Sequence, residues 1–248
     1  MAATMTSSPE YYAGLLDMQL GVTFRANKHV RALLTSTDAR VVDQITAKFA
    51  PTKITTVRRP GKKESCVVLF VHEDARPLLE FAAEHCLCRK HIAQAGLKFL
   101  DGALDVAGVQ AAMAAAIEAP ATAPIAWIAG VFDMRGSVSF PPEGKRAIKL
   151  AFPKSERALL AAILVQLPHG RVKKSSPCRL VFESKESIRG FLAVLGGHVR
   201  SKRGDLDQLE TALASGASAG VRVAADGDTG DKCDTDGPPP LESSDSTE

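Results

Sequence analysis

The spacing of apolar and polar residues along the chain predicts short helices alternating with half-buried strands. Apolar residues recur every three or four positions in some segments, as on one face of a helix, and at every second position in others, as in a strand. Serine and aspartate favour the start of a helix and proline its first turn. For the first half the pattern predicts a helix from Pro9 to about Met18 after Ser8, strands at 22–27 and 30–35, a helix at 39–49 capped by Asp38, a hairpin at 52–71 with Pro60-Gly61 at its tip, and helices up to about Ile117.

The second half of the chain repeats this order after the short Pro/Ala segment EAPATAP. It is expected to contain a helix ending near Arg135, strands at 137–140 and 146–152 around a turn at 141–145, a helix at 155–167, strands at 171–174 and 178–183, and a helical region at about 185–214. The predicted fold class is α+β, with two α-β-β-α-β-β-α halves that each contain an antiparallel sheet. The expected divisions are a first half at 1–116, a linker at 117–123, a second half at 124–215 and a tail at 216–248.

An internal repeat supports this division into halves. Residues 13–24 read AGLLDMQLGVTF and residues 129–140 read AGVFDMRGSVSF, so six of twelve positions are identical at an offset of 116 residues. In each copy a predicted helix leads directly into a predicted strand. A repeat of this period indicates a duplicated domain.

Charge is distributed unevenly along the 248 residues, although the net charge is only +3. The segment 216–248 carries eight acids against Arg222 and Lys232, a net charge of −6, which leaves about +9 for the rest of the chain. Its Gly, Ser, Asp and Pro residues predict disorder, because they offer almost no apolar surface to bury. A basic body indicates an anionic partner. The acidic tail either competes for the same surface or serves only to keep the protein in solution.

The cysteines and the apolar runs constrain the compartment. Five scattered cysteines, an odd number, favour a reducing compartment over a disulfide framework. No apolar run approaches the roughly 20 residues that span a bilayer, so no membrane partner is expected. The first motif begins by residue 12, which leaves no room for a signal peptide if the N-terminus is complete.

The two motif copies and the order of elements after them resemble the single-chain LAGLIDADG homing endonucleases over about residues 9–215. The resemblance implies two motif helices packed along a pseudo-twofold axis, with Ala and Gly allowing close approach, and a saddle formed by two antiparallel sheets. It also implies a Mg²⁺-dependent DNA endonuclease, in which an acid at the end of each motif helix holds a divalent ion against the scissile phosphate. Because both copies lie in one chain, a monomer is expected.

The chain departs from this family pattern at the two positions that bind metal. The acids are replaced by Gln19, which is neutral, and by Arg135, which repels a cation. Asp17 and Asp133 are retained, but they match another motif position about 200° around the helix and are expected to brace the helix packing. We therefore assign no catalytic residue and no metal ligand from the sequence. No cofactor is expected, and Mg²⁺ enters only if the protein is an active endonuclease.

A second family feature is a basic residue near the start of the last helix in each half, close to the reacting phosphates. Arg89 or Lys90 matches that place in the first half, and Lys202 or Arg203 matches it in the second. A solvated helix face explains the same residues, so none of the four is assigned a catalytic role.

The sequence also contains one group of candidate zinc ligands. His85, Cys88 and His91 would share one face of a continuous helix. A structural zinc site normally closes with a fourth ligand, and none is evident nearby. Buried cysteines and a surface histidine are the simpler interpretation.

A basic surface on the predicted strands and turns is not affected by the changes at the metal-binding positions. Twisted antiparallel strands fit a major groove, while Lys and Arg near their ends neutralise phosphates. Charged hairpins also protect sheet edges from aggregation, but the resemblance and the basic body favour binding. The candidate nucleic-acid-binding residues are Arg25, Lys28, Arg31, Lys53, Arg58, Arg59, Lys62, Lys63, Lys149, Arg171, Lys173, Lys174 and Arg179.

Two classes of function follow from these observations. The first is a cleavage-incompetent protein that binds DNA or structured RNA, the RNA option being implied by relatives that serve splicing as intron maturases. The second is an active site-specific DNA endonuclease with a rebuilt metal site. A basic saddle that docks a protein or a ribonucleoprotein is a further alternative. Gln19 and Arg135 favour binding over cleavage.

Overall fold

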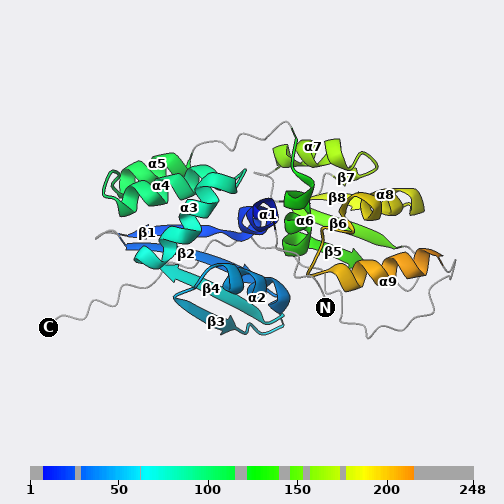
Figure 1. The fold of residues 1–248 in the computed structure, drawn as a ribbon, viewed down its shortest axis with the longest axis horizontal. Helices are drawn as coiled ribbons and strands as arrows, with labels where there is room; N and C mark the ends of the chain where they lie inside the picture. Colours follow the sequence, from blue (N-terminus) through cyan, green and yellow to red (C-terminus); the bar gives the residue numbers. More distant parts are fainter. Residues whose placement is uncertain are drawn as a thin grey trace.

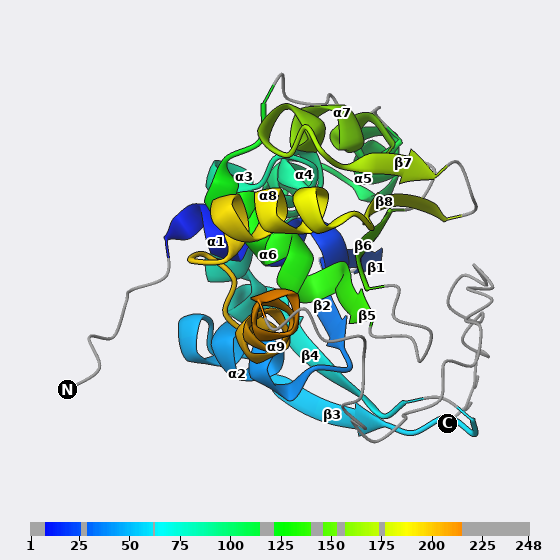
Figure 2. The ribbon, with the colours of Figure 1, turned by 90° about the vertical axis from the view of Figure 1, so that its right-hand side faces the viewer.

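The two helices that carry the repeated motif pack against each other at the centre of the computed structural model (Figures 1 and 2). They are α1 (Pro9–Gln19) and α6 (Ile125–Arg135). Each ends where a strand begins, because β1 starts at Gly21 and β5 starts at Gly136. The structure describes residues 8–25, 29–61, 63–114, 122–139, 146–152, 157–173 and 177–214.

A four-stranded antiparallel sheet in the order β1-β2-β4-β3 lies on one side of the helix pair (Figure 1). Its strands are β1 (Gly21–Arg25), β2 (His29–Ser36), β3 (Lys53–Val57) and β4 (Ser65–Val71). The helices of this half are α2 (Ala39–Lys48), the short 3₁₀ helix η1 (His72–Ala75), α3 (Arg76–His85), α4 (Lys90–Leu100) and α5 (Val106–Met113).

The other side of the helix pair carries a second antiparallel sheet with the equivalent order β5-β6-β8-β7 (Figure 1). Its strands are β5 (Gly136–Ser139), β6 (Ala147–Phe152), β7 (Arg171–Lys173) and β8 (Cys178–Phe182). The helices of this half are α7 (Arg157–Gln166), α8 (Lys185–Leu195) and α9 (Arg203–Ala214). The predicted α+β fold with duplicated halves is therefore confirmed.

Glycine in both motif copies allows the backbones of α1 and α6 to touch. A Cβ atom added to Gly14 would lie 2.1 Å from the carbonyl oxygen of Trp127, and one added to Gly130 would lie 2.1 Å from that of Tyr11. Since any side chain at either position would displace the backbone of the other helix, the small residues of the repeat determine the distance between the two halves.

The hydrophobic core lies between the helices and one face of each sheet. In β2, Val30, Ala32 and Leu34 are buried while the residues between them are partly exposed. In β6, Ile148 and Leu150 are buried in the same way. This alternation leaves the opposite face of each sheet uncovered by the core, and we call the two uncovered faces together the open face.

The hairpin predicted at 52–71 is confirmed as β3 and β4, although its connection is longer than a tight turn. The strands pair from Lys53 with Leu69 to Val57 with Ser65. Gly61 has a φ of +69°, as expected for the glycine of a Pro-Gly turn. Asp38 caps α2 as predicted, since its side chain accepts a hydrogen bond from the backbone N–H of Arg40.

The helical regions predicted at the ends of both halves each contain more than one helix. Three helices follow β4, and the helical region at 185–214 is divided into α8 and α9 by a loop at 196–202. Several predicted features lie outside the described residues: the turn at 141–145, the linker up to residue 121 and the tail at 216–248.

Candidate nucleic-acid interface

Asp17 is fully buried at the end of α1, and its carboxylate accepts four hydrogen bonds. One oxygen accepts from the backbone N–H of Leu87 at 2.7 Å and from Trp127 Nε1 at 2.8 Å. The other accepts from the backbone N–H groups of Cys88 at 2.9 Å and Arg89 at 2.7 Å. Burial raises the pKa of Asp17, and the donors from Trp127 and the backbone act against that shift.

Asp133 occupies the equivalent place in α6 and is also fully buried. Its carboxylate accepts from the Tyr11 hydroxyl at 2.7 Å and from the backbone N–H groups of Arg200 at 2.8 Å and Lys202 at 2.9 Å. Burial, together with the charge of Asp133, raises the pKa of Tyr11. Asp17 thus binds the backbone just before α4, and Asp133 binds the backbone just before α9.

Each aspartate also holds an aromatic residue of the other half. Trp127 lies 116 residues after Tyr11, the same offset that relates Asp133 to Asp17. Tyr11 donates to Asp133 and Trp127 donates to Asp17, so the two bonds are related by the repeat. Neither aromatic residue is among the candidates predicted from the sequence, although their shared offset of 116 residues is a signal that could identify them.

The two positions that replace the metal-binding acids lie where α1 and α6 end. Arg135 donates from Nε at 3.1 Å and from Nη2 at 2.6 Å to the carbonyl oxygen of Met18. This carbonyl belongs to the last turn of α1, where carbonyl groups lack helical partners and a cation is favoured. Gln19, which is half-buried, is the last residue of α1. The guanidinium of one half therefore completes the helix end of the other.

Arg89 and Lys202 correspond to each other across the two halves. Arg89 Nε donates to the backbone carbonyl of Asp17 at 3.3 Å, and Lys202 Nζ donates to that of Asp133. Burial lowers the pKa of Lys202, and the nearby carboxylates of Asp133 and Asp38 oppose this effect. Arg89 and Lys202, two of the four residues left open by the sequence, therefore contact the motif helices.

A polar cleft of about 380 Å³ opens where the two halves meet beside Arg135. Four cationic side chains and two carboxylates contribute to it, so its lining is basic on balance. Its residues are Ser36, Thr37, Asp38, Ala39, Arg40 and Lys63 from the first half, and Met134, Arg135, Gly136, Lys202 and Asp205 from the second. Such a lining suits an anion shared between the halves.

The residues at the motif helix ends do not fit the divalent metal that the resemblance implies. Arg135 brings a permanent positive charge that is already directed at Met18. Both carboxylate oxygens of Asp17 are occupied by N–H donors, which point where a cation would have to sit. Within the described residues there is no group of three or more His, Cys, Asp or Glu side chains that could hold a metal ion.

The strand register places the predicted basic residues of the sheets on the open face. In the first sheet Arg31 and His29 alternate along β2 with the buried residues Val30, Ala32 and Leu34, so they lie on the opposite face. Arg25 pairs with His29 and therefore lies on that face too. In the second sheet Lys149 alternates with buried Ile148 and Leu150. By the same alternation, the strand cations on the open face are Arg25, Arg31, Lys53, Lys149, Arg171, Lys173 and Arg179.

The remaining predicted basic residues lie in the connections. Arg58, Arg59 and Lys63 are exposed on the long turn of the β3-β4 hairpin, where Arg58 forms an ion pair with Glu64. In the second sheet Glu183 forms ion pairs with Arg171 and Lys173, so part of that charge is already balanced. The predicted residues Lys28, Lys62 and Lys174 lie outside the described residues.

The zinc interpretation is wrong in its structural premise. α3 ends at His85 and α4 begins at Lys90, so His85, Cys88 and His91 do not lie on one continuous helix. The break allows the intervening backbone N–H groups to bind Asp17. Cys88 is buried, as the simpler interpretation predicted.

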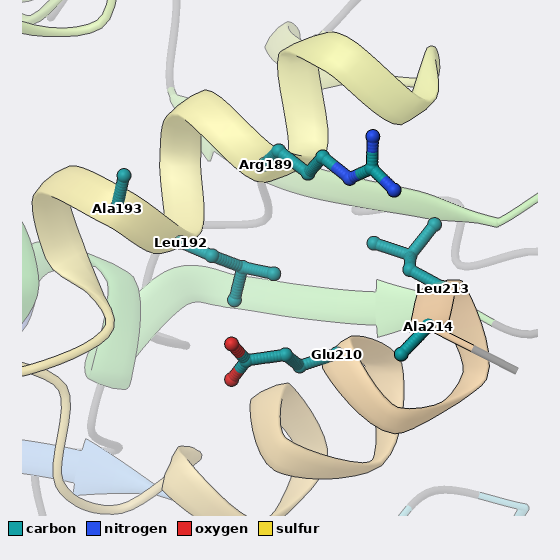
Figure 3. A pocket seen from close by; sticks show the side chains of 6 residues that line it. All are labelled: Arg189, Leu192, Ala193, Glu210, Leu213 and Ala214. Atoms are coloured by element: carbon teal, nitrogen blue, oxygen red, sulfur yellow. The ribbon is translucent and has the colours of Figure 1, made fainter.

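A second groove, of about 310 Å³, lies between α8 and α9 (Figure 3). Its walls combine apolar side chains with one cation and one acid. The lining residues are Arg189, Leu192, Ala193, Glu210, Leu213 and Ala214. None of them belongs to the open face or to the motif helices, so this groove is separate from the candidate interface.

Comparison with known proteins shows the same fold in solved structures. No protein-family model and no curated protein sequence matches the chain. The LAGLIDADG homing endonuclease I-GzeII in complex with its DNA target matches with a TM-score of 0.63 and 12% identity, over 84% of this chain and 90% of that one. The LAGLIDADG meganuclease I-AabMI bound to uncleaved DNA matches with a TM-score of 0.63 and 11% identity, over 84% and 91%.

A third structure, I-SmaMI bound to uncleaved DNA in the presence of calcium ions, matches with a TM-score of 0.54 and 13% identity, over 84% of this chain and 94% of that one. At these identities the comparisons show the fold, which is that of the single-chain LAGLIDADG homing endonucleases. The resemblance inferred from the two motifs is confirmed at this level. No helix in the described part of the chain is long and apolar enough to cross a membrane.

Proposed function

We propose that this protein binds double-stranded DNA along the open face of its two sheets and does so without a metal-dependent cleavage centre. The observation that carries the proposal is the distribution of charge on the strands. The eight described strands contain seven Lys and Arg residues and no Asp or Glu, and all seven cations lie on the open face.

The composition of the open face suits a duplex. Thr23, Thr55 and Ser137 offer hydroxyl groups that can bind base edges, and Leu33 and Leu69 offer apolar contacts for thymine methyl groups. The cations at the strand ends and on the β3-β4 turn are placed to neutralise phosphates. The DNA-bound proteins of the same fold support this choice of partner over RNA.

The motif helix ends support binding without cleavage. Arg135 stands where the resemblance implies a metal-binding acid, beside the basic cleft between the halves. A guanidinium there supplies the positive charge that a metal would supply and can pair directly with a phosphate. It cannot lower the pKa of a water molecule by coordination, so affinity is retained while the metal-activated nucleophile is lost.

The test is a binding titration with a fluorescent duplex, using a pool of random 30-base-pair sequences to select the preferred site. Binding should weaken steeply with salt and should not change when EDTA is added. The variant Lys53→Gln/Arg179→Gln removes one exposed cation from each sheet and should reduce the slope of log K against log salt by about 1.8. A matched control, Lys98→Gln/Lys185→Gln, removes two exposed helix cations outside the open face and should leave the slope unchanged.

Three outcomes would contradict the proposal. Equal slopes for the two double variants would show that the open face does not contact phosphates. Stronger binding to structured RNA than to any duplex DNA would change the partner. Cleavage of the selected duplex in Mg²⁺ or Mn²⁺ would favour the endonuclease alternative with a rebuilt metal site.

A further inference from the structure

Two histidines join two arginines at the outer end of the first sheet. β1 runs away from the central helices (Figure 1), and its last residue, Arg25, pairs with His29 at the start of β2. Arg31 lies on the same face, and the ring of His72 meets that of His29 edge-on with 4.1 Å between ring centroids. Both arginines are among the binding residues predicted from the sequence, whereas neither histidine is.

The backbone of His72 is held in a conformation that costs energy. Its φ of +52° is the only positive value at a non-glycine residue in the described part of the chain. Left-handed backbone is uncommon for residues other than glycine, and such outliers concentrate at functional sites. His72 directly follows β4, and in this conformation its ring contacts the ring of His29.

The hydrogen bond within the cluster defines the protonation of His29. Arg31 Nε donates to His29 Nε2 at 2.8 Å, so Nε2 is an acceptor and the imidazole is neutral. Partial burial lowers the pKa of His29, and His72, Arg31 and Arg25 lower it further by charge repulsion. η1 carries Glu73, which interacts electrostatically with His72 and is paired with Arg76 at 2.8 Å. The cluster is therefore cationic with a neutral imidazole at its centre.

We propose that His29, His72, Arg25 and Arg31 form a binding site for a DNA backbone phosphate, and that His29 takes up one proton from solvent when the phosphate binds. The inference rests on the proposed function, because the open face must carry a duplex for a phosphate to reach the cluster. A phosphate attracts Arg31 away from His29 Nε2 and brings a negative charge. Both changes favour the imidazolium, which then donates a hydrogen bond to the phosphate.

Among the residues that the structure describes, the strands of the second sheet carry no such arrangement, which makes the expected effect specific to one half. The corresponding outer pair of β5 and β6 is Ser139 with Ala147, and neither side chain titrates. The proton taken up on binding should therefore come from the first half alone, and the outer ends of the two sheets should contribute unequally to the pH dependence of affinity.

The experiment measures the dissociation constant of the selected duplex from pH 6 to pH 8 at constant ionic strength, together with calorimetry in two buffers of different protonation enthalpy. The full chain should bind about tenfold more tightly at pH 6 than at pH 8 and take up a proton on binding. His29→Gln keeps an acceptor for Arg31 but cannot titrate, so it should bind with little pH dependence. The control His198→Gln removes an exposed imidazole outside the sheets and should behave as the parent.

A second variant distinguishes a role of His72 in phosphate binding from a role in the stability of the fold. His72→Asn removes the ring but retains a residue that tolerates left-handed backbone, so the thermal unfolding temperature should change little while the pH dependence decreases. Identical pH profiles for the parent and His29→Gln, with DNA still bound, would overturn this inference and leave the proposed function intact. Absence of DNA binding at every pH would overturn the proposed function and this inference with it.

Discussion

The two motif helices carry the same aspartate at the same place but hold the opposite half through different groups. Asp17 accepts from the indole N–H of Trp127, whereas Asp133 accepts from the hydroxyl of Tyr11. An indole can only donate, while a hydroxyl can rotate and either donate or accept. Both aspartates thus hold the opposite half in the same way. A substitution at Asp17 is nevertheless expected to cost more stability than the same substitution at Asp133, because the indole of Trp127 can only donate.

The difference between the halves is larger at the helix ends. Arg135 extends from α6 to the carbonyl of Met18 in α1, and Gln19 stands at the corresponding end of α1. One end of the central pair is therefore cationic and the other is neutral. The glycines and aspartates that pack the two halves are thus the same in both copies of the repeat, while the residues at the helix ends, Gln19 and Arg135, differ.

The largest expected effect concerns the contact that both halves share. Gly14→Ala and Gly130→Ala should each destabilise the protein by about 3 kcal/mol, because the new methyl group would overlap a backbone carbonyl of the other helix. Urea unfolding measures the change. Gly204→Ala is the control, since a Cβ there meets nothing within 4 Å. If only one of the two motif variants were destabilised, the equivalence of the halves at this contact would be wrong.

The next effect distinguishes the halves. Asp17→Asn should cost about 3 kcal/mol, because its amide N–H₂ would face N–H groups that can only donate. Asp133→Asn should cost about 1 kcal/mol less, because the Tyr11 hydroxyl can rotate to accept from the new amide. Urea unfolding measures the cost of both substitutions. The fluorescence of Trp127, the only tryptophan, also reports directly on the contact that Asp17→Asn changes. Equal costs for the two variants would remove the distinction between indole and hydroxyl.

The sequence was sufficient for features that depend on local pattern or on the repeat. The strands, the cap at Asp38 and the β3-β4 hairpin follow from periodicity and turn chemistry, and the central helix pair follows from the 116-residue offset. The expectation that Asp17 and Asp133 brace the helix packing follows from their position about 200° around the helix from Gln19 and Arg135.

Features that depend on contacts between distant segments could not be predicted. The loop at 86–89 is not helical because its N–H groups bind Asp17, which lies 70 residues earlier. The partner of Arg135 is a backbone carbonyl in the other half, and backbone carbonyls have no signature in a sequence. The histidine pair at His29 and His72 requires the pairing of β2 with β4 and a left-handed residue, neither of which a local pattern specifies.

The smallest effect on stability comes from the position where the helix ends diverge. Arg135→Gln gives α6 the same terminal residue as α1 and should cost about 1 kcal/mol, because the Met18 carbonyl loses a charged donor. If the guanidinium also contacts a phosphate, the slope of log K against log salt for DNA binding should fall by about one. Binding by the parent and by Arg135→Gln should be insensitive to EDTA.

Arg135→Asp should weaken binding further without metal, since an anion then faces the phosphate. Adding Gln19→Asp to that variant places a carboxylate at each helix end, and its binding should strengthen when Mg²⁺ is added. Titrations with and without Mg²⁺ measure these differences. Duplex cleavage by the unmodified protein in Mg²⁺, abolished by EDTA, would instead show that the protein has a working metal site.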